Sequence, residues 1–210
     1  MKTLLHPSYF PDIRTFSILV QNDIIWEVED NYQKQTFRNR TYIANDRGLH
    51  ALSIPIKHVG ISQGRRKYKD VRIENVEAWQ RQHWRTLQTA YRTSPFFEYY
   101  EDELAPLYNT QFEFLLDFNL KTIETICDCL QIEMTKTKTI VYEPEPLAHI
   151  DARFLINRKK KVEFNPEAYI QVFDNRHGFI KNISVLDLLF NEGTNAVTYL
   201  KNQNTDFLNA

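Results

Sequence analysis

The chain has 210 residues and a formal net charge of −1, with 42% hydrophobic and 25% charged residues. This length and composition fit one globular unit over residues 1–210 and exclude a mostly disordered chain. The balance of 26 basic to 27 acidic residues disfavours nucleic acid as a partner. No apolar run approaches the ~20 residues that span a bilayer, and no signal-peptide core is visible, so we expect a cytoplasmic protein without a membrane span.

The first third of the chain predicts short strands around one helix. Strands are expected at 3–5, 24–28, 41–43, 49–56 and 70–73, and a helix over 12–20. Between the second and third strands lies a polar run, residues 31–40, with the cations Lys34, Arg38 and Arg40. A polar loop between buried strands is a frequent place for a binding site, although it can also be a solvated turn.

From Asn75 onward the apolar spacing becomes helical. One face of the first helix carries Val76, Trp79, His83, Leu87 and Ala90. Two further helices are expected over 96–108 and 111–132, and the second contains Cys127 and Cys129. A helix directs these two thiols about 200° apart, so we expect buried free thiols and no disulfide, redox or zinc motif.

The remainder of the chain predicts strands at 139–142 and 169–173, with an exposed basic turn at 158–161 between them. A helix is expected over 185–191, capped by Ser184 and ending at Gly193, and a last helical turn over 195–200. Strands and helices do not alternate regularly. The sequence therefore predicts an α+β fold, with a mixed sheet and a central helical section at about 76–132, in a single compact unit.

Common phosphate-binding, zinc-protease and serine-hydrolase motifs are absent, and the sequence identifies no metal site and no cofactor. Polar residues at strand ends remain as candidates. His6 follows the first strand and suits a general base or a ligand, or a hydrogen-bonded structural role. Glu29 follows the second strand and could orient His6 or an arginine, or form a surface ion pair. His50 begins the edge strand.

Asp187 lies within an apolar helical pattern, where a carboxylate is costly without a partner. Arg40 and Arg176 are the candidate partners that the sequence suggests. A second basic segment, residues 65–69, lies beside Gly60 and Gly64 and predicts a mobile basic loop, with or without a partner.

Several segments in order carry a family resemblance. They are His6-Pro7-Ser8-Tyr9-Phe10-Pro11, the run 31–40, Leu52-Ser53-Ile54-Pro55-Ile56, Trp79 to Tyr91 with Ser94-Pro95-Phe96-Phe97, and Ile183 to Gly193. Together they resemble the WbqC-like family, in the shorter form seen in Bacteroidetes-type bacteria. The resemblance covers nearly the whole chain, through the order and spacing of the segments and not through one decisive motif.

Members of that family usually begin with His-Gln-Pro, so His6 matches the family histidine and the glutamine is missing. The family's Lys and Asn-Arg pattern falls on Lys34, Asn39 and Arg40, and its acidic residue falls on Glu29. The resemblance implies a pathway, that of surface-polysaccharide (O-antigen) synthesis. The reaction it suggests is transfer of an acyl or aminoacyl group onto an amino sugar.

Two hypotheses follow. In the first, the protein is a transferase that acts on a small-molecule sugar or sugar nucleotide, with an acyl carrier protein as a further candidate partner. Its candidate catalytic residues are His6, Glu29 and Lys34, and its candidate substrate-binding residues are Tyr9, Asn31, Asn39, Arg40, His50 and Asp187. In the second, the protein is a non-catalytic binding or assembly module of the same pathway, which uses the loop 65–69 to bind a carrier protein or an anionic ligand.

Overall fold

The computed structural model describes residues 1–57 and 66–208, and its first feature is a parallel sheet of short strands. Strand β1 (Lys2–Leu5) lies between β2 (Ile24–Trp26) and β5 (His149–Asp151). The register places Leu4 of β1 beside Ile25 on one side and Asp151 on the other. Parallel strands end at the same edge of a sheet, so the residues that follow β1, β2 and β5 are brought together there.

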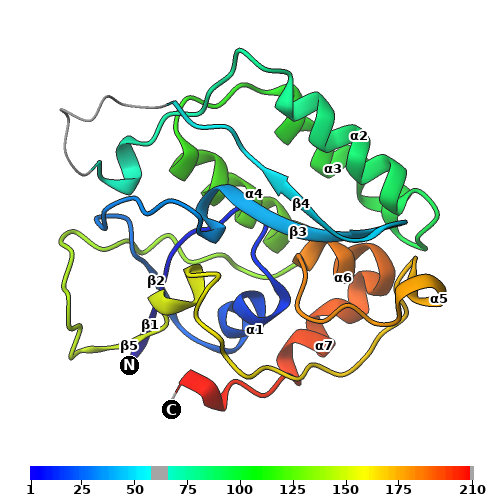
Figure 1. The fold of residues 1–210 in the computed structure, drawn as a ribbon. Helices are drawn as coiled ribbons and strands as arrows, with labels where there is room; N and C mark the ends of the chain where they lie inside the picture. Colours follow the sequence, from blue (N-terminus) through cyan, green and yellow to red (C-terminus); the bar gives the residue numbers. More distant parts are fainter. Residues whose placement is uncertain (58–65, 209–210) are drawn as a thin grey trace.

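An antiparallel hairpin of β3 (Arg40–Asn45) and β4 (Gly48–Ser53) crosses the molecule beyond that edge. Helices α2 (Trp79–Tyr91) and α3 (Phe97–Asn109) lie on one side of the hairpin in Figure 1, and α6 (Val185–Glu192) and α7 (Ala196–Lys201) lie on the other. Helix α4 (Leu115–Cys129) packs against α3, and α1 (Ile13–Gln21) packs against α6 and α7. The hairpin therefore has helices on two sides, while alternate residues of β4 remain exposed.

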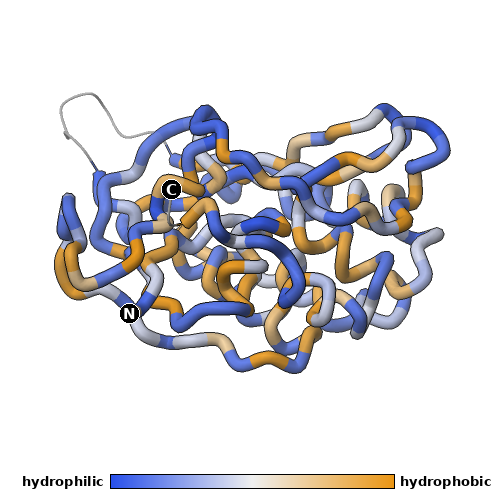
Figure 2. The backbone as a smooth tube through the Cα atoms, turned by 90° about the horizontal axis from the view of Figure 1, so that it is seen from below, coloured by the Kyte–Doolittle hydropathy of each residue, from blue (hydrophilic) through white to orange (hydrophobic). Residues whose placement is uncertain are grey.

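Short helical elements complete the chain. They are η1 (Phe37–Asn39), η3 (Tyr68–Asp70), η4 (Arg153–Ile156), α5 (Asp174–His177), η5 (Gly193–Asn195) and η6 (Asp206–Leu208). The tube in Figure 2 shows apolar and hydrophilic stretches in alternation along the chain. The apolar stretches supply a core rich in aromatic rings, in which Trp26, Tyr68, Tyr91, Phe97 and Phe118 are fully buried.

The fold class predicted from sequence is confirmed: the protein is α+β, with its central helices at 79–91, 97–109 and 115–129. The Ser184 cap is confirmed as well, because its Oγ accepts from the amide of Leu186 at the start of α6. The first central helix, however, begins at Trp79, and Val76 is 90% exposed outside it.

Three predicted strands are wrong. In the segment 70–73, Tyr68–Asp70 form a 3-10 turn, and Arg72 and Ile73 make only isolated bridges. The segment 139–142 forms no strand; only the preceding Lys138 bridges to Trp26, and Ile140 is 93% exposed. The segment 169–173 is not assigned to a strand, and Tyr169 turns inward as a single side chain. None of these three segments pairs with a neighbouring strand over several residues in the part of the chain that the structure describes. A strand is stabilised by such pairing, which the local sequence does not reveal.

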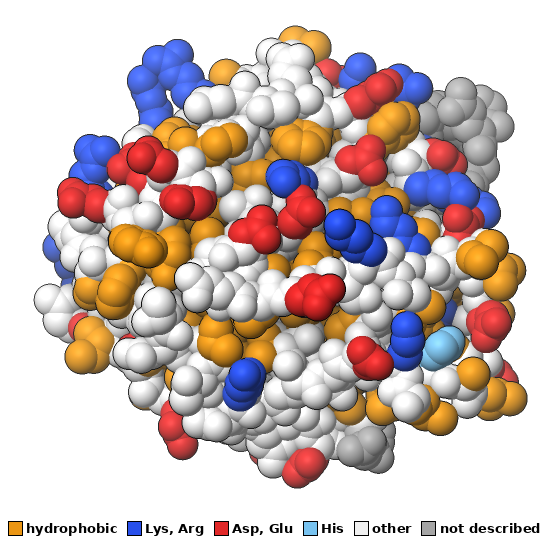
Figure 3. All heavy atoms as spheres, turned by 180° about the vertical axis from the view of Figure 1, so that it is seen from behind, with side chains coloured by type: hydrophobic (Ala, Val, Ile, Leu, Met, Phe, Trp, Pro, Cys, Tyr) orange, Lys and Arg blue, Asp and Glu red, His pale blue; other side chains and the backbone are white. Residues whose placement is uncertain are grey.

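The surface mixes charges of both signs. On the face drawn in Figure 3, Lys and Arg side chains lie among Asp and Glu side chains. Among the described residues, none of the helices combines the length and the hydropathy that crossing a bilayer requires.

Two glycines that end helices give a direct test of the packing around α6. Gly193 ends α6 at a φ of +55°, and a Cβ there would lie 2.7 Å from the ring of Phe96. Gly178 has a φ of +67° but nothing within 4 Å of its added Cβ. We expect Gly178→Ala to lower the free energy of unfolding by ~1 kcal/mol, because only the positive φ of its backbone opposes a side chain there. Gly193→Ala should lower it by ~3 kcal/mol, because overpacking against Phe96 adds to the same backbone strain. Urea denaturation of both variants measures the difference, and equal losses would contradict the close packing of Phe96 against Gly193.

Candidate functional site

Ionisable side chains meet at the carboxyl edge of the parallel sheet. His6 directly follows β1, Glu27 directly follows β2, and Asp151 is the last residue of β5. Asp30 and Arg153 come within a few residues of the same strand ends. Apart from Asp151, these side chains are buried, which makes the edge an unusual concentration of charge inside the molecule. Ligands of open sheets that contain parallel strands commonly bind at this edge.

His6, Asp30 and Arg38 form the centre of this cluster. The Arg38 Nη2 group donates to Asp30 Oδ2 at 2.6 Å and lies 3.1 Å from His6 Nε2. The same Asp30 oxygen is 3.3 Å from His6 Nε2. Arg38 has no exposed surface, so its charge depends on Asp30 for compensation. Removal of Asp30 would leave a buried and uncompensated guanidinium.

His6 is held as a neutral imidazole. Burial, and then the neighbouring Arg38 charge, lower the pKa of His6 from 6.5 to about 4, although Asp30 opposes that shift. The His6 Nδ1 atom is 3.3 Å from the backbone oxygen of Glu27. A proton on Nδ1 can therefore be donated to Glu27, which leaves Nε2 as an acceptor toward Arg38. Burial works against ionisation of Asp30, but the contacts with His6 and Arg38 outweigh it and lower the pKa of Asp30.

Arg38 is fixed by side chains from other elements. The Asn119 amide of α4 donates to the Arg38 backbone oxygen, and the guanidinium lies 5.2 Å from the ring centroid of Tyr68. The Tyr68 hydroxyl in turn donates to the backbone oxygen of Pro7 at 2.8 Å. Within the described residues, the Nε and Nη1 groups of Arg38 have no hydrogen-bond acceptor. An oxygen of a bound ligand would satisfy such donors.

A second ion pair lies beside the first. Arg153 donates from Nε and Nη2 to the two oxygens of Asp151, at 2.8 Å each, in a bidentate pair. Its Nη1 group lies 3.4 Å from Glu27 and donates to the backbone oxygen of Glu143 at 2.7 Å. Arg153 therefore joins β5, the end of β2 and the segment around 143. Arg153 is also the first residue of η4.

A small cavity adjoins His6. It is lined by Ser8, Asp12 and Phe37, and on the other side by Leu155 and Ile156 of η4, among others. Its volume of ≈ 10 Å³ has room for about one water molecule. A sugar at His6 would therefore have to displace Phe37 or the residues of η4.

Three predicted residues of the polar run gather elsewhere. Lys34, Asn39 and Arg40 line one open groove of ≈ 400 Å³, together with Tyr32. The Tyr32 hydroxyl donates to Asn39 Oδ1 at 3.1 Å. The structure therefore brings these three residues together, but it places them in a different pocket from the His6 cavity. The buried Arg38 lies in the chain between Phe37, which lines the His6 cavity, and Asn39, which lines the groove.

Of the two roles expected for Glu29, the structure shows the surface ion pair, and Asp30 takes the position beside His6. Glu29 accepts from Lys67 at 2.8 Å and from Lys69 at 2.6 Å, and these two lysines lower the pKa of Glu29. Both lysines belong to the predicted basic loop, of which Arg65 lies outside the described residues. Asn31 also faces that segment, through a bridge to Lys67, and its backbone N–H donates to Asp30 Oδ1.

Two other predicted residues lie away from the cluster. Tyr9 is buried, and its hydroxyl contacts His83 Nδ1 at 2.9 Å and the Tyr108 hydroxyl at 3.0 Å. This polar contact lies within the aromatic core and includes the helix-face histidine. His50 is half-buried on β4, opposite Ile43. Neither residue adjoins the cavity at His6.

Asp187 forms a separate buried group. Tyr91 and Tyr169 donate their hydroxyls to its two oxygens at 2.8 and 2.6 Å, and Gln171 donates to it at 3.0 Å. Burial raises the pKa of Asp187, although these donors oppose the shift. The predicted pairing with Arg40 or Arg176 is wrong, because neutral donors compensate the carboxylate. Asp187 thus joins α2, α6 and the segment around 169.

Sequence reasoning left Asp30, Glu27, Asp151 and Arg153 out of the site. Asp30 directly follows the predicted Glu29, and Glu27 lies two residues before it. The sequence therefore indicated the correct strand end but the wrong carboxylate. Asp151 and Arg153 were out of reach because the short strand β5 was not predicted.

Among the described residues, no group of three or more His, Cys, Asp and Glu side chains could hold a metal ion. Burial raises the pKa of each thiol, Cys127 and Cys129, to about 12.

The fold and the site define an α+β protein with a buried charged cluster at the carboxyl edge of a small parallel sheet. Residues 6–164 match the model of the WbqC-like protein family, and the chain belongs to that family. The chain is also similar to a protein of Mycobacterium tuberculosis (strain ATCC 25618 / H37Rv), named "Uncharacterized protein Rv1507c". The two are 26% identical over 226 residues, which cover 94% of this chain and 96% of the relative. The comparison with solved structures gives no significant match.

The two buried histidines predict how stability depends on pH. Burial lowers the pKa of His83, like that of His6, to about 4, so the unfolded chain binds more protons than the folded chain between about pH 6.5 and pH 4. The free energy of unfolding should therefore fall on acidification through this window, by at most ~1.4 kcal/mol per pH unit for each histidine. Urea denaturation at about pH 7 and about pH 5 measures the slope.

The variant His83→Gln should lose part of that slope, while the exposed His177→Gln should keep it. A slope that is the same in both variants and in the wild type would show that the buried histidines do not cause it.

Proposed function

We propose that this WbqC-like protein is a transferase of surface-polysaccharide synthesis that moves an acyl or aminoacyl group onto the amine of an amino sugar. The observation that supports the proposal is the neutral His6, buried against Asp30 and Arg38 where the parallel strands end. A base that is neutral near pH 7 and has a carboxylate beside it is equipped to take a proton.

In the proposed step, the sugar nitrogen attacks the carbonyl carbon of an activated acyl ester or thioester. His6 Nε2 takes the proton that the amine loses once Arg38 Nη2, which lies 3.1 Å from the same nitrogen, has turned away from it; Asp30, 3.3 Å away, then stabilises the resulting imidazolium. The bond between the carbonyl carbon and the leaving group then breaks, and the proton passes to the leaving group. Arg38 holds Asp30 in place and offers N–H donors near the centre where the oxyanion forms.

The groove of Lys34, Asn39 and Arg40 supports the binding of an anionic part of the donor. Two cations and an amide in one open groove suit a phosphate or a carboxylate. Tyr32 links the groove to the cluster, since its ring lies 6.4 Å from that of Tyr68, which Arg38 contacts. The reactive end of the donor would then reach His6 by displacement of Phe37, which lines the His6 cavity.

The test of this step compares variants in a transfer assay. Purified protein is mixed with amino-sugar nucleotides and activated acyl or aminoacyl donors, and the mass gain of the sugar is followed by mass spectrometry. His6→Gln and Asp30→Asn should each reduce the rate by ~10²- to 10⁴-fold, the usual contribution of a general base. His177→Gln, which changes an exposed histidine, should retain the wild-type rate.

Circular dichroism and the melting temperature establish that each variant is folded before its rate is read. Folded His6→Gln protein with the wild-type rate would contradict the role of His6 as the base.

A second candidate function is a non-catalytic binding or assembly module of the same pathway. The small volume of the His6 cavity favours it, as does the open groove at Lys34 and Arg40. This module would hold an anionic ligand without turning it over.

A thermal-shift screen tests the groove in both candidate functions. Sugar nucleotides, acyl carriers and simple anions are added to the wild type, to Arg40→Ala, and to Arg47→Ala as a matched control at the exposed hairpin turn. We expect an anion to raise the melting temperature of the wild type and of Arg47→Ala, but not that of Arg40→Ala, because Arg40 supplies a donor to the groove. Equal shifts in all three proteins would exclude the groove as the anion site.

A further inference from the structure

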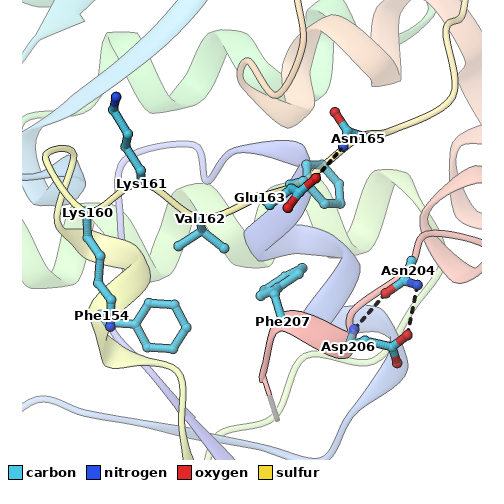
Figure 4. Close-up of a pocket in the computed structure, with 10 residues that line it drawn as sticks. Phe154, Lys160, Lys161, Val162, Glu163, Asn165, Asn204, Asp206 and Phe207 are labelled. Atoms are coloured by element: carbon cyan, nitrogen blue, oxygen red, sulfur yellow. Dashed lines mark hydrogen bonds between the residues drawn. The ribbon is translucent and has the colours of Figure 1, made fainter. Parts of the chain in front are cut away.

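A cleft of ≈ 710 Å³ is bordered by η4, the turn that also lines the His6 cavity. The segment 160–165 forms one wall and residues 204–207 form the other, with Phe154 of η4 at one end (Figure 4). Its volume falls within the range of small-molecule sites. None of the residues predicted from sequence to form the site lies in it.

The centre of the cleft is an apolar slot. In Figure 4 the ring of Phe154 lies at one end of the cleft and the ring of Phe207 near its middle, and Val162 lies between them along one wall. Phe207 is held by Phe164, whose ring lies edge-on to it with centroids 6.0 Å apart. The segment that carries Phe207 is anchored to α1, since Gln21 donates to the backbone oxygens of Leu200 and Gln203. The Phe207 side of the slot is therefore held in place by its own contacts.

Polar side chains of three kinds surround the slot. Lys160 extends across the ring of Phe154, with its Nζ atom 4.1 Å from the ring centroid. At the other end stand two amides, Asn165 and Asn204, and two carboxylates, Glu163 and Asp206. Each carboxylate accepts from an amide, Glu163 from Asn165 at 3.4 Å and Asp206 from Asn204 at 2.9 Å.

We propose that this cleft binds the nucleoside diphosphate part of a sugar nucleotide. Bases of any sequence stack on aromatic rings, and Phe207 offers such a ring, whereas Lys160 covers one face of Phe154. Amide side chains can donate to and accept from the edge of a base, and carboxylates accept from ribose hydroxyls. Lys160 supplies the positive charge that a phosphate requires. Groups that can contact the base, the ribose and the phosphates thus surround one slot.

The cleft and the His6 cavity are both bordered by η4. Phe154 lines the cleft, while the next two residues of η4, Leu155 and Ile156, line the cavity at His6. A sugar attached to the diphosphate would extend across η4 toward His6. This relation rests on the proposed function, because it makes the nucleotide a carrier of the amino sugar that accepts the acyl group.

Binding alone tests the proposal, without any transfer assay. Isothermal titration calorimetry measures the dissociation constants of UDP, ADP, uridine and inorganic pyrophosphate with the full chain. We expect UDP or ADP to bind more tightly than pyrophosphate by about fivefold or more, the effect of stacking one base. Uridine should bind more weakly than UDP because it lacks the phosphates.

Three variants locate the site. Phe207→Ala should remove the advantage of the nucleotide over pyrophosphate, because Phe207 forms one end of the slot. Lys160→Glu should weaken the binding of the diphosphates and leave that of uridine unchanged. Lys159→Glu is the matched control: it places the same charge change one residue earlier on the exposed turn, outside the cleft, and should bind like the wild type.

The outcomes separate clearly. Pyrophosphate that binds as tightly as both nucleotides, or nucleotide affinities that Phe207→Ala leaves unchanged, would overturn the proposal, as would the absence of nucleotide binding at millimolar concentration. Equal losses in Lys160→Glu and Lys159→Glu would also overturn it, since they would indicate only general attraction to the basic turn. A cleft that binds nucleotides in a protein without transfer activity would refute the proposed function and leave this site in place.

Discussion

The arrangement of the site depends on a buried guanidinium. Arg38 is inaccessible to solvent, and its Nη2 group contacts both the carboxylate of Asp30 and the ring of His6. A charge in this position is tolerable only where an opposite charge and hydrogen bonds compensate it. Those contacts join the run 31–40 to the ends of β1 and β2, and Asn119 joins the same residue to α4. One ion pair therefore fixes the relation between the polar loop, the parallel sheet and the central helices.

The parallel strands explain why the functional groups converge. Strands β1, β2 and β5 end at one edge although they come from distant parts of the sequence, so His6, Glu27 and Asp151 become neighbours. Arg153 pairs with Asp151 and begins η4, the turn whose residues line both the His6 cavity and the cleft of Phe154 and Phe207. In the proposed account, donor and acceptor approach His6 from two sides, one over the run 31–40 and the other over η4. Both approaches require side chains at the cavity to move, because it holds about one water molecule.

The sequence was informative where local rules decide the structure. The helices of the central section follow from apolar spacing, and the start of α6 follows from the capping oxygen of Ser184. His6 was recognised as a candidate because it follows a strand. The partner of His6 was misplaced by one residue, from Asp30 to Glu29, because composition does not tell which of two adjacent carboxylates turns inward. Asp187 was expected to need a cation, whereas hydroxyl and amide donors from distant segments satisfy it. The cleft could not be foreseen, since Phe154 and Phe207 are brought together only by tertiary contacts.

The most direct test of the buried pair is the protonation state of His6 in solution. Nitrogen chemical shifts of the histidine rings, followed by NMR while the pH is lowered, report that state for each ring, and the resonances of His6 are identified from a His6→Gln sample. The account predicts that His6 remains neutral as the pH falls through 6.5 and takes up its proton only near pH 4, because it is buried beside Arg38. In Arg38→Met the pKa of His6 should rise, since the neighbouring positive charge is removed and Asp30 stays. A His6 that titrates near 6.5 in the wild type, unaffected by Arg38→Met, would contradict the burial of the pair and the site built on it.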